Sequence, residues 1–240
     1  MTFNALNLKP HLNKQVINFN TLKIMKTVST LKKLVLIALV IGFSSCSSDD
    51  DNSAAPAPAP TPNPVQSELV ENFPAPQTGG QGQPIGGPFT KFDFETGLET
   101  SSDTEWDIAF RGTTIAINGG TATGTTDEPN RNGDVGAAIV SGTTFANVTS
   151  ADGLTFVQDA NAAFAIPTGS DNGWYNYNFM TNVVSAIPGK VIVFRTRDGK
   201  YAKVEILSYY LNQDSSNPSN GRYYTFNYVY NPNDGDTSFE

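Results

Sequence analysis

The segment Val191-Ile-Val-Phe-Arg-Thr-Arg-Asp-Gly-Lys-Tyr-Ala-Lys-Val-Glu-Ile-Leu207 determines the expected fold class. Two runs rich in β-branched and aromatic residues flank Asp198-Gly199, a pair that suits the positive φ angles of a type I′ turn. A two-residue loop would place Val193 opposite Val204, with one apolar face and one mixed face. The segment therefore predicts an antiparallel hairpin with a core side and an outer side.

The same alternation recurs on both sides of this hairpin. Short runs of β-branched and aromatic residues between turn formers lie at 89–97, 106–110, 113–118, 138–140, 154–157 and 222–230. Beyond residue 45 we find no convincing amphipathic helix, and residues 160–164 are expected to form no more than one short turn. The sequence therefore predicts an all-β protein of antiparallel sheets.

Composition and charge exclude several classes of protein. The 240 residues carry a net charge of -8, whereas a nucleic-acid partner would require clustered positive charge. Hydrophobic residues make up 38% and charged residues 16%, which is sufficient for a buried core. With one Cys and one His, neither an internal disulfide nor a Cys/His zinc site can form.

The N-terminal segment has the pattern of a secretory signal. Residues 1–45 hold six Lys, the only His and no acidic residue, and Leu34–Phe43 is an apolar run too short to span a bilayer, which needs about 20 residues. Small residues then precede Cys46, an arrangement that resembles the lipobox of bacterial lipoproteins. This resemblance implies that Cys46 is lipidated and that residues 1–45 are a signal peptide, with Met25 as the expected true start.

Residues 46–64 are expected to form a tether. Asp49-Asp50-Asp51 resembles the export signal that sends Bacteroidota lipoproteins to the cell surface, although any solvated tether is also polar. Proline at every second position from Pro56 to Pro64 indicates a stiff spacer, and a Gly- and Pro-rich piece at 74–88 indicates a loop. The expected organisation is therefore a signal peptide at 1–45, a tether at 46–64 and a β domain at 65–240.

Four blocks of the β domain resemble successive blocks of one known family. They are Glu105–Gly120, Gly173–Tyr177, Val193–Tyr210 and Gly221–Tyr230, and in this order they resemble the HmuY family of β-rich outer-membrane lipoproteins. The resemblance implies a single HmuY-like domain that binds haem, or another planar apolar ligand, without catalysis. It also implies a surface position, anchored or released, and transfer of haem to a TonB-dependent transporter for iron acquisition.

The ligand set implied by the family is incomplete here. Members ligate haem iron with two His or two Met, one after the Asn-Gly-Gly block and one after the Trp-Tyr block. From Cys46 onward the chain has no His and one Met, Met180, in the second of these positions. The candidate haem contacts are Met180 as an axial ligand and, as apolar walls, Trp174, Tyr175, Tyr177 and Phe179.

Three interpretations of Met180 remain open. It is an axial haem ligand, it fills a gap in the core as most methionines do, or it lies beside a pocket for an iron-free planar ligand. The alternative function is a surface interaction module that keeps the scaffold but has lost haem ligation. A glycan-active enzyme using Asp103, Glu105 and Asp107 is the third hypothesis, although solubility of a sheet edge explains these acids more simply. We predict no enzymatic activity.

Overall fold

The computed structural model of the protein describes residues 61–80 and 82–240. The expected signal peptide, the start at Met25, the lipidated Cys46 and the acidic export signal all lie outside the described residues, as does most of the tether at 46–64. In the described part of the chain, no helix combines the length and apolar character needed to cross a membrane.

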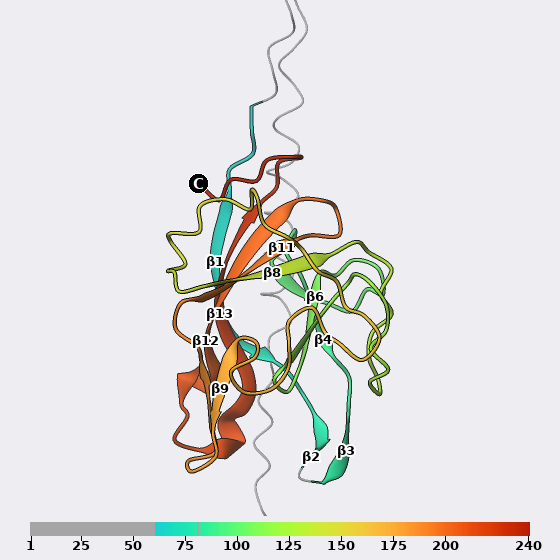
Figure 1. Ribbon diagram of the computed structural model, residues 1–240, viewed down its shortest axis with the longest axis vertical. Coiled ribbons are helices and arrows are strands. Elements are labelled where there is room, and N and C mark those ends of the chain that lie inside the picture. Colours follow the sequence, from blue (N-terminus) through green and yellow to red (C-terminus); the bar gives the residue numbers. More distant parts are fainter. Residues whose placement is uncertain (1–60, 81) are drawn as a thin grey trace, which may run out of the picture. The chain divides into compact units, whose positions relative to one another are not determined.

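Two antiparallel sheets form the framework of the described unit (Figure 1). The larger has the order β1-β13-β12-β11-β8 and the smaller the order β5-β4-β6-β7, while β2–β3 and β9–β10 are separate hairpins. The strands are β1 (Gln66–Pro74), β2 (Thr78–Gly80), β3 (Gln83–Gly86), β4 (Thr90–Asp93), β5 (Leu98–Thr100), β6 (Ile108–Arg111), β7 (Thr114–Ile117), β8 (Gly136–Ser141), β9 (Tyr175–Asn178), β10 (Val183–Ala186), β11 (Lys190–Arg195), β12 (Tyr201–Tyr210) and β13 (Gly221–Asn231). Within the described residues, helix is limited to two short 3-10 turns, η1 (Leu211–Gln213) and η2 (Pro218–Asn220). The prediction of an all-β, antiparallel fold is confirmed.

Aromatic rings fill the main core, to which both sheets contribute. Phe92 of β4 packs edge-on against Phe226 and Tyr228 of β13, with ring centroids 5.4 and 5.5 Å apart. Phe110 of β6 stacks on Phe226 at 5.7 Å. All four rings are at most 2% exposed, and aromatic pairs of this kind stabilise a core beyond the area that they bury.

The β11–β12 hairpin forms with a register that differs by one residue from the predicted one. Val204 pairs with Ile192 rather than with Val193, because the loop has three residues, 197–199, instead of two. The Gly199 amide donates to the Thr196 carbonyl, and Gly199 has a φ of 75°, as in a turn that ends in a left-handed residue. The prediction of a two-residue type I′ turn is therefore wrong.

Both faces of this hairpin are buried, which the sequence pattern did not indicate. Ile192 belongs to the main core, while Val191 and Val193 belong to a second cluster that also contains Phe239 near the C-terminus. Lys203 lies on this second face and is 4% exposed. Its Nζ donates to the carbonyls of residues 145 and 148 at 2.7 and 2.8 Å, so the charge is satisfied inside the fold.

Other segments also depart from expectation. The run at 154–157 forms only an isolated bridge, between Val157 and Ala137, rather than a strand. The Gly- and Pro-rich piece at 74–88 contains the β2–β3 hairpin rather than only loop, and the sequence did not indicate β1 or β5. The Gly- and Pro-rich composition at 74–88 therefore did not indicate the β2–β3 hairpin.

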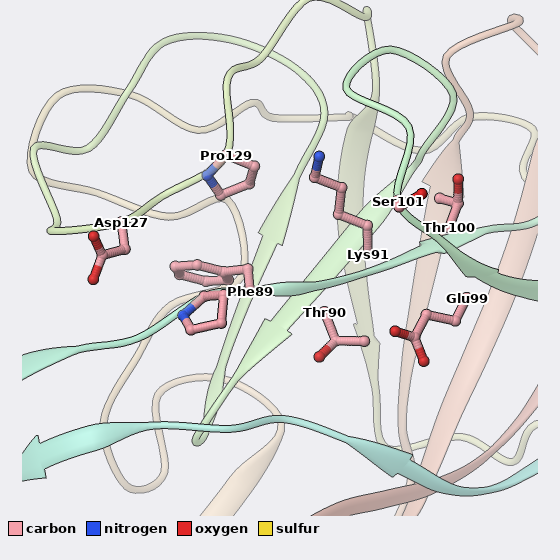
Figure 2. A pocket seen from close by; sticks show the side chains of 9 residues that line it. Phe89, Thr90, Lys91, Glu99, Thr100, Ser101, Asp127 and Pro129 are labelled. Carbon is pink, nitrogen blue, oxygen red and sulfur yellow. The ribbon is translucent and has the colours of Figure 1, made fainter.

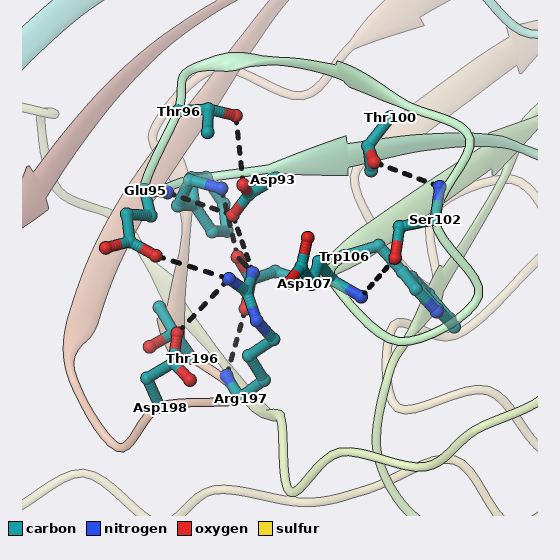
Figure 3. A network of polar contacts seen from close by, with 12 residues as sticks. Asp93, Glu95, Thr96, Thr100, Ser102, Trp106, Asp107, Thr196, Arg197 and Asp198 are labelled. Carbon is teal, nitrogen blue, oxygen red and sulfur yellow. Dashed lines mark hydrogen bonds and ion pairs between the residues drawn. The ribbon is translucent and has the colours of Figure 1, made fainter.

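An Arg-centred network of ion pairs connects the two sheets (Figure 3). Arg197, in the β11–β12 loop, bonds through Nη1 to Asp93 Oδ1 at 2.6 Å, and Asp107 accepts hydrogen bonds from the Arg197 and Phe94 amides at 2.9 Å each. Burial of the Asp107 carboxyl raises its pKa from 3.8 to about 6, although these hydrogen bonds oppose the shift.

The acids proposed for a glycan-active enzyme do not converge. Asp107 is 1% exposed and faces Arg197, whereas the Asp103 side chain is 87% exposed and paired with Lys91. Glu105 is exposed as well. This arrangement does not place two of these carboxyls across a shared cleft, as glycoside hydrolysis requires.

Candidate functional site

The β9–β10 hairpin holds the only thioether of residues 61–240. Asn178 pairs with Val183, so a four-residue loop, Phe179–Asn182, forms the tip. Asn178 Oδ1 accepts hydrogen bonds from the amides of Met180 and Thr181 at 2.9 and 3.3 Å, and Asn182 has a φ of 57°. These contacts fix the backbone of the loop, since Asn readily forms such local turns and tolerates this conformation.

Three of the predicted contact residues are exposed at this tip. Met180 is 78% exposed, Phe179 77% and Tyr177 41%. Met180 therefore does not fill a gap in the core, and that interpretation is wrong. The Tyr177 hydroxyl donates to Asn182 Oδ1 at 2.7 Å, which ties the two sides of the hairpin together.

The other two predicted contact residues support the hairpin from the core. Trp174 is 2% exposed and Tyr175 8%. Trp174 Nε1 donates to the Thr113 carbonyl at 3.0 Å, and its ring lies 5.1 Å from that of Tyr224. The structure thus leaves Tyr177, Phe179 and Met180 exposed on one hairpin but places Trp174 and Tyr175 in the core.

Single hydrogen bonds, rather than a strand ladder, attach the hairpin to its surroundings. The Val184 amide donates to the Tyr210 hydroxyl oxygen at 2.8 Å. On the other strand, the Tyr177 amide donates to Ser170 Oγ at 2.8 Å, and Asn176 Nδ2 donates to Asp171 Oδ1 at 2.7 Å. These bonds hold both strands of the hairpin, while Phe179 and Met180 in the loop stay exposed.

A cavity of about 470 Å³ is lined by two loops that precede the hairpin in the sequence. Its lining residues are Thr123, Thr125, Ala162, Ala163, Phe164, Pro167 and Thr168. Thr168 is two residues before Ser170, which bonds to β9, so the loop that lines the cavity continues to the base of the hairpin. The volume lies within the range of small-molecule pockets, which is about 300–1,000 Å³.

Buried charges hold the loops that line this cavity. Arg131 Nη1 and Nη2 bond to Glu128 and Asp159 at 2.7 and 2.8 Å, and the Arg131 side chain is 1% exposed. Burial works against ionisation of both acids. It raises the pKa of Asp159, whereas hydrogen bonds from the Thr123 amide and from Arg131 lower that of Glu128. The sequence did not indicate the pair of Arg131 and Asp159, because these two residues are 28 positions apart in the chain.

A second cavity, of about 430 Å³, lies over the four-stranded sheet beside β4 and β5 (Figure 2). Phe89 lines it, and the Arg111 guanidinium covers this ring at 4.3 Å from the centroid. None of the predicted contact residues lines this cavity. In residues 61–80 and 82–240, no group of three His, Cys, Asp or Glu side chains is placed to hold a metal ion.

Comparison with known proteins gives one match to a family and several to solved structures. The family model described as HmuY protein matches residues 88–228. An apo HmuY analog from Tannerella forsythia is 15% identical and has a TM-score of 0.45, covering 72% of this chain and 99% of its own. A protein from Bacteroides vulgatus proposed to be HmuY-like and heme-binding is 17% identical with a TM-score of 0.42, covering 70% of this chain and 93% of its own. A search of curated proteins gave no match.

Proposed function

The chain belongs to the HmuY family, and on this premise we propose that it is an outer-membrane surface lipoprotein that captures haem, or a related tetrapyrrole, for uptake. In this proposal Cys46 carries the lipid anchor and binding involves no catalysis. Protein that is released from the membrane would carry the same binding site as the anchored protein. The haem would then pass to a TonB-dependent outer-membrane transporter.

The exposure of Phe179 and Met180 at a fixed hairpin tip is the observation that carries the proposal. Two adjacent large apolar side chains, each more than three-quarters exposed, would gain free energy by burial against a ligand. The hydrogen bonds to Asn178 Oδ1 order the loop before any ligand arrives, which lowers the entropy cost of binding.

The chemistry of these residues suits haem. A thioether is an established axial ligand of haem iron, and it is a soft donor. The Phe179 ring, which is 77% exposed, and the partly exposed Tyr177 ring would offer apolar surface to a porphyrin face. Since soft donors favour the lower oxidation state, the reduced haem is expected to bind more tightly than the oxidised haem.

The position of the hairpin suits capture by a tethered protein. The chain enters the described unit at β1, and the β9–β10 hairpin lies towards the other end of this unit (Figure 1). This end of the described unit is therefore the end that we propose for capture.

A haem titration of the purified protein tests the proposal. We expect a saturable, shifted Soret band in the wild type, and binding weaker by at least about tenfold in Met180→Leu, because even outer-shell partners of metal ligands contribute that much. Leu98→Ala is the matched control, since Leu98 is 64% exposed on another sheet. Spectra that match free haem would refute haem capture and would favour the surface interaction module.

A further inference from the structure

A further cavity lies between the β9–β10 hairpin and the connection from β12 to β13. Its volume is about 390 Å³, which is within the range of small-molecule pockets. Its lining residues are Asn182, Val184, Tyr209, Tyr210, Pro218, Ser219, Gly221 and Arg222. Neither Phe179 nor Met180 lines it, so the cavity is separate from the contacts proposed for haem.

The backbone of Arg222, in the wall of this cavity, has a conformation that arginine rarely adopts. Its φ is 74°, in the left-handed region that favours glycine. Arg222 is exposed, so packing of its side chain in the core does not impose this conformation. Backbone strain of this kind is concentrated at functional sites. The strain therefore points to a role for the Arg222 side chain besides folding.

Two tyrosines form the wall of the cavity that adjoins the core. Tyr209 and Tyr210 are 9% and 4% exposed, and their rings pack edge-on with centroids 5.5 Å apart. The Tyr209 ring also lies 5.6 Å from that of Tyr224, so the wall is continuous with the aromatic core. The Tyr210 hydroxyl accepts a hydrogen bond from the Val184 amide at 2.8 Å. This wall is therefore formed before a ligand arrives, which lowers the cost of binding.

Arg222 brings a positive charge to the aromatic wall. Burial raises the pKa of the Tyr209 phenol to about 12, and the Arg222 guanidinium opposes this shift through its charge and a hydrogen bond. Arg222 Nη1 donates to the Gln77 carbonyl at 2.7 Å. A guanidinium has five N–H donors, so these two contacts leave others available. In residues 61–80 and 82–240, no ion pair joins Arg222 to a carboxylate.

The surroundings of the cavity do not neutralise this charge. No acidic residue lines the cavity, and residues 172–189, which include the whole hairpin, contain no charged side chain. Asp214, in the connection from β12 to β13, accepts hydrogen bonds from the Ser216 amide and from Asn220 Nδ2. An anion that enters the cavity would therefore meet one cation and no carboxylate among the lining residues.

We propose that this cavity binds a small carboxylate that has an apolar or aromatic group. The available N–H donors of the planar Arg222 guanidinium suit the two oxygens of a carboxylate. The apolar group would pack against the Tyr209 ring and Val184. One guanidinium matches the single charge of a carboxylate, whereas a phosphate dianion would keep a charge uncompensated. This site is independent of haem capture, because none of the proposed haem contacts lines it.

Calorimetric titration of the purified protein with 3-phenylpropionate tests the proposal. We expect saturable binding of one ligand per chain, with shifts of the Val184 and Gly221 amide signals in NMR spectra. The neutral 3-phenylpropionamide and inorganic phosphate should not bind. A lack of binding by 3-phenylpropionate would overturn the proposal. Equal binding of the amide would overturn the role of the charge, and equal binding of phosphate would overturn that of the apolar group.

Substitutions of Arg222 isolate its contribution. Arg222→Gln should weaken binding of 3-phenylpropionate by at least about tenfold, because it removes hydrogen bonds between charged groups. Arg195→Gln is the matched control and should bind as the wild type does, since it removes the same charge from a residue paired with Asp134 and outside the cavity. Unchanged affinity in Arg222→Gln, or an equal loss in Arg195→Gln, would overturn the assignment of Arg222.

A glycine at position 222 separates binding from stability. Because glycine adopts a φ of 74° without strain, Arg222→Gly should lose binding while its urea midpoint stays at or above that of the wild type. A lower midpoint would show that the fold requires the side chain and would overturn the argument from strain. The probes contain no haem, so failure of this proposal leaves haem capture standing.

Discussion

Replacing Asp107 by Asn should remove a specific part of the pH dependence of stability. Asp107 is 1% exposed, and its pKa is raised from 3.8 to about 6 by burial of the carboxyl. A group whose pKa is higher in the folded state binds its proton more strongly there than in the unfolded chain. Its ionisation therefore lowers the free energy of unfolding as the pH rises from about 4 to about 6.

The size of this effect follows from the pKa shift. A change of one pKa unit corresponds to about 1.4 kcal/mol, so a rise from 3.8 to about 6 corresponds to about 3 kcal/mol between pH 4 and pH 7. Asn resembles the protonated carboxyl in shape and cannot ionise. The difference in unfolding free energy between Asp107→Asn and wild type should therefore grow by about 3 kcal/mol, in favour of the variant, from pH 4 to pH 7.

Urea unfolding of both proteins at half-unit pH intervals measures this difference. Asp103→Asn is the matched control, because pairing with Lys91 lowers the pKa of Asp103, a shift opposite in sign to that of Asp107. A constant difference between Asp107→Asn and wild type across the range would refute the reasoning. It would mean that the hydrogen bonds from Arg197 and Phe94 compensate fully for burial of the charge.

Three further substitutions test the supports of the fold and of the candidate site. Tyr210→Phe removes the acceptor of the Val184 amide and should cost about 1 kcal/mol, with faster hydrogen exchange at that amide as the local readout. Arg131→Met leaves Asp159 buried without its cation and should cost about 3–5 kcal/mol in urea unfolding; a loss below 1 kcal/mol would contradict this account. Lys203→Met strands two buried carbonyls and should lower stability by about 2 kcal/mol, measured by thermal unfolding, whereas an unchanged midpoint would show that packing of the new side chain compensates.

Alternation in the sequence predicted the fold class because it reflects burial on one side of a strand. It failed at one loop: Gly199 has a positive φ but Asp198 does not, so the loop also takes in Arg197, and Val204 pairs with Ile192 instead of Val193. It also failed at 74–88, where glycine and proline hide a short hairpin. A register depends on the backbone conformation of its turn, and side-chain periodicity does not specify that conformation.

The candidate site was predictable only in part for a different reason. The sequence identifies Met180 as the single thioether beyond residue 45. Its exposure could not be predicted, because the sequence does not show which of the neighbouring aromatic rings are buried in the core. Trp174 and Tyr175 are buried against residues distant in the sequence, whereas Phe179 lies beyond the end of β9 and remains outside. Residues five positions apart in one aromatic segment therefore have opposite surroundings.

This division separates the proposed contact residues from the residues that support the fold. Trp174 and Tyr175 hold the base of the hairpin through contacts with Thr113 and the aromatic core, while the tip loop is ordered by its own Asn178. Burial stabilises the first pair of residues, and exposure leaves Phe179 and Met180 nearly free of any role in stability. Exchange of Met180 is therefore expected to leave the fold intact, so a loss of haem binding in Met180→Leu would report on the proposed contact rather than on misfolding.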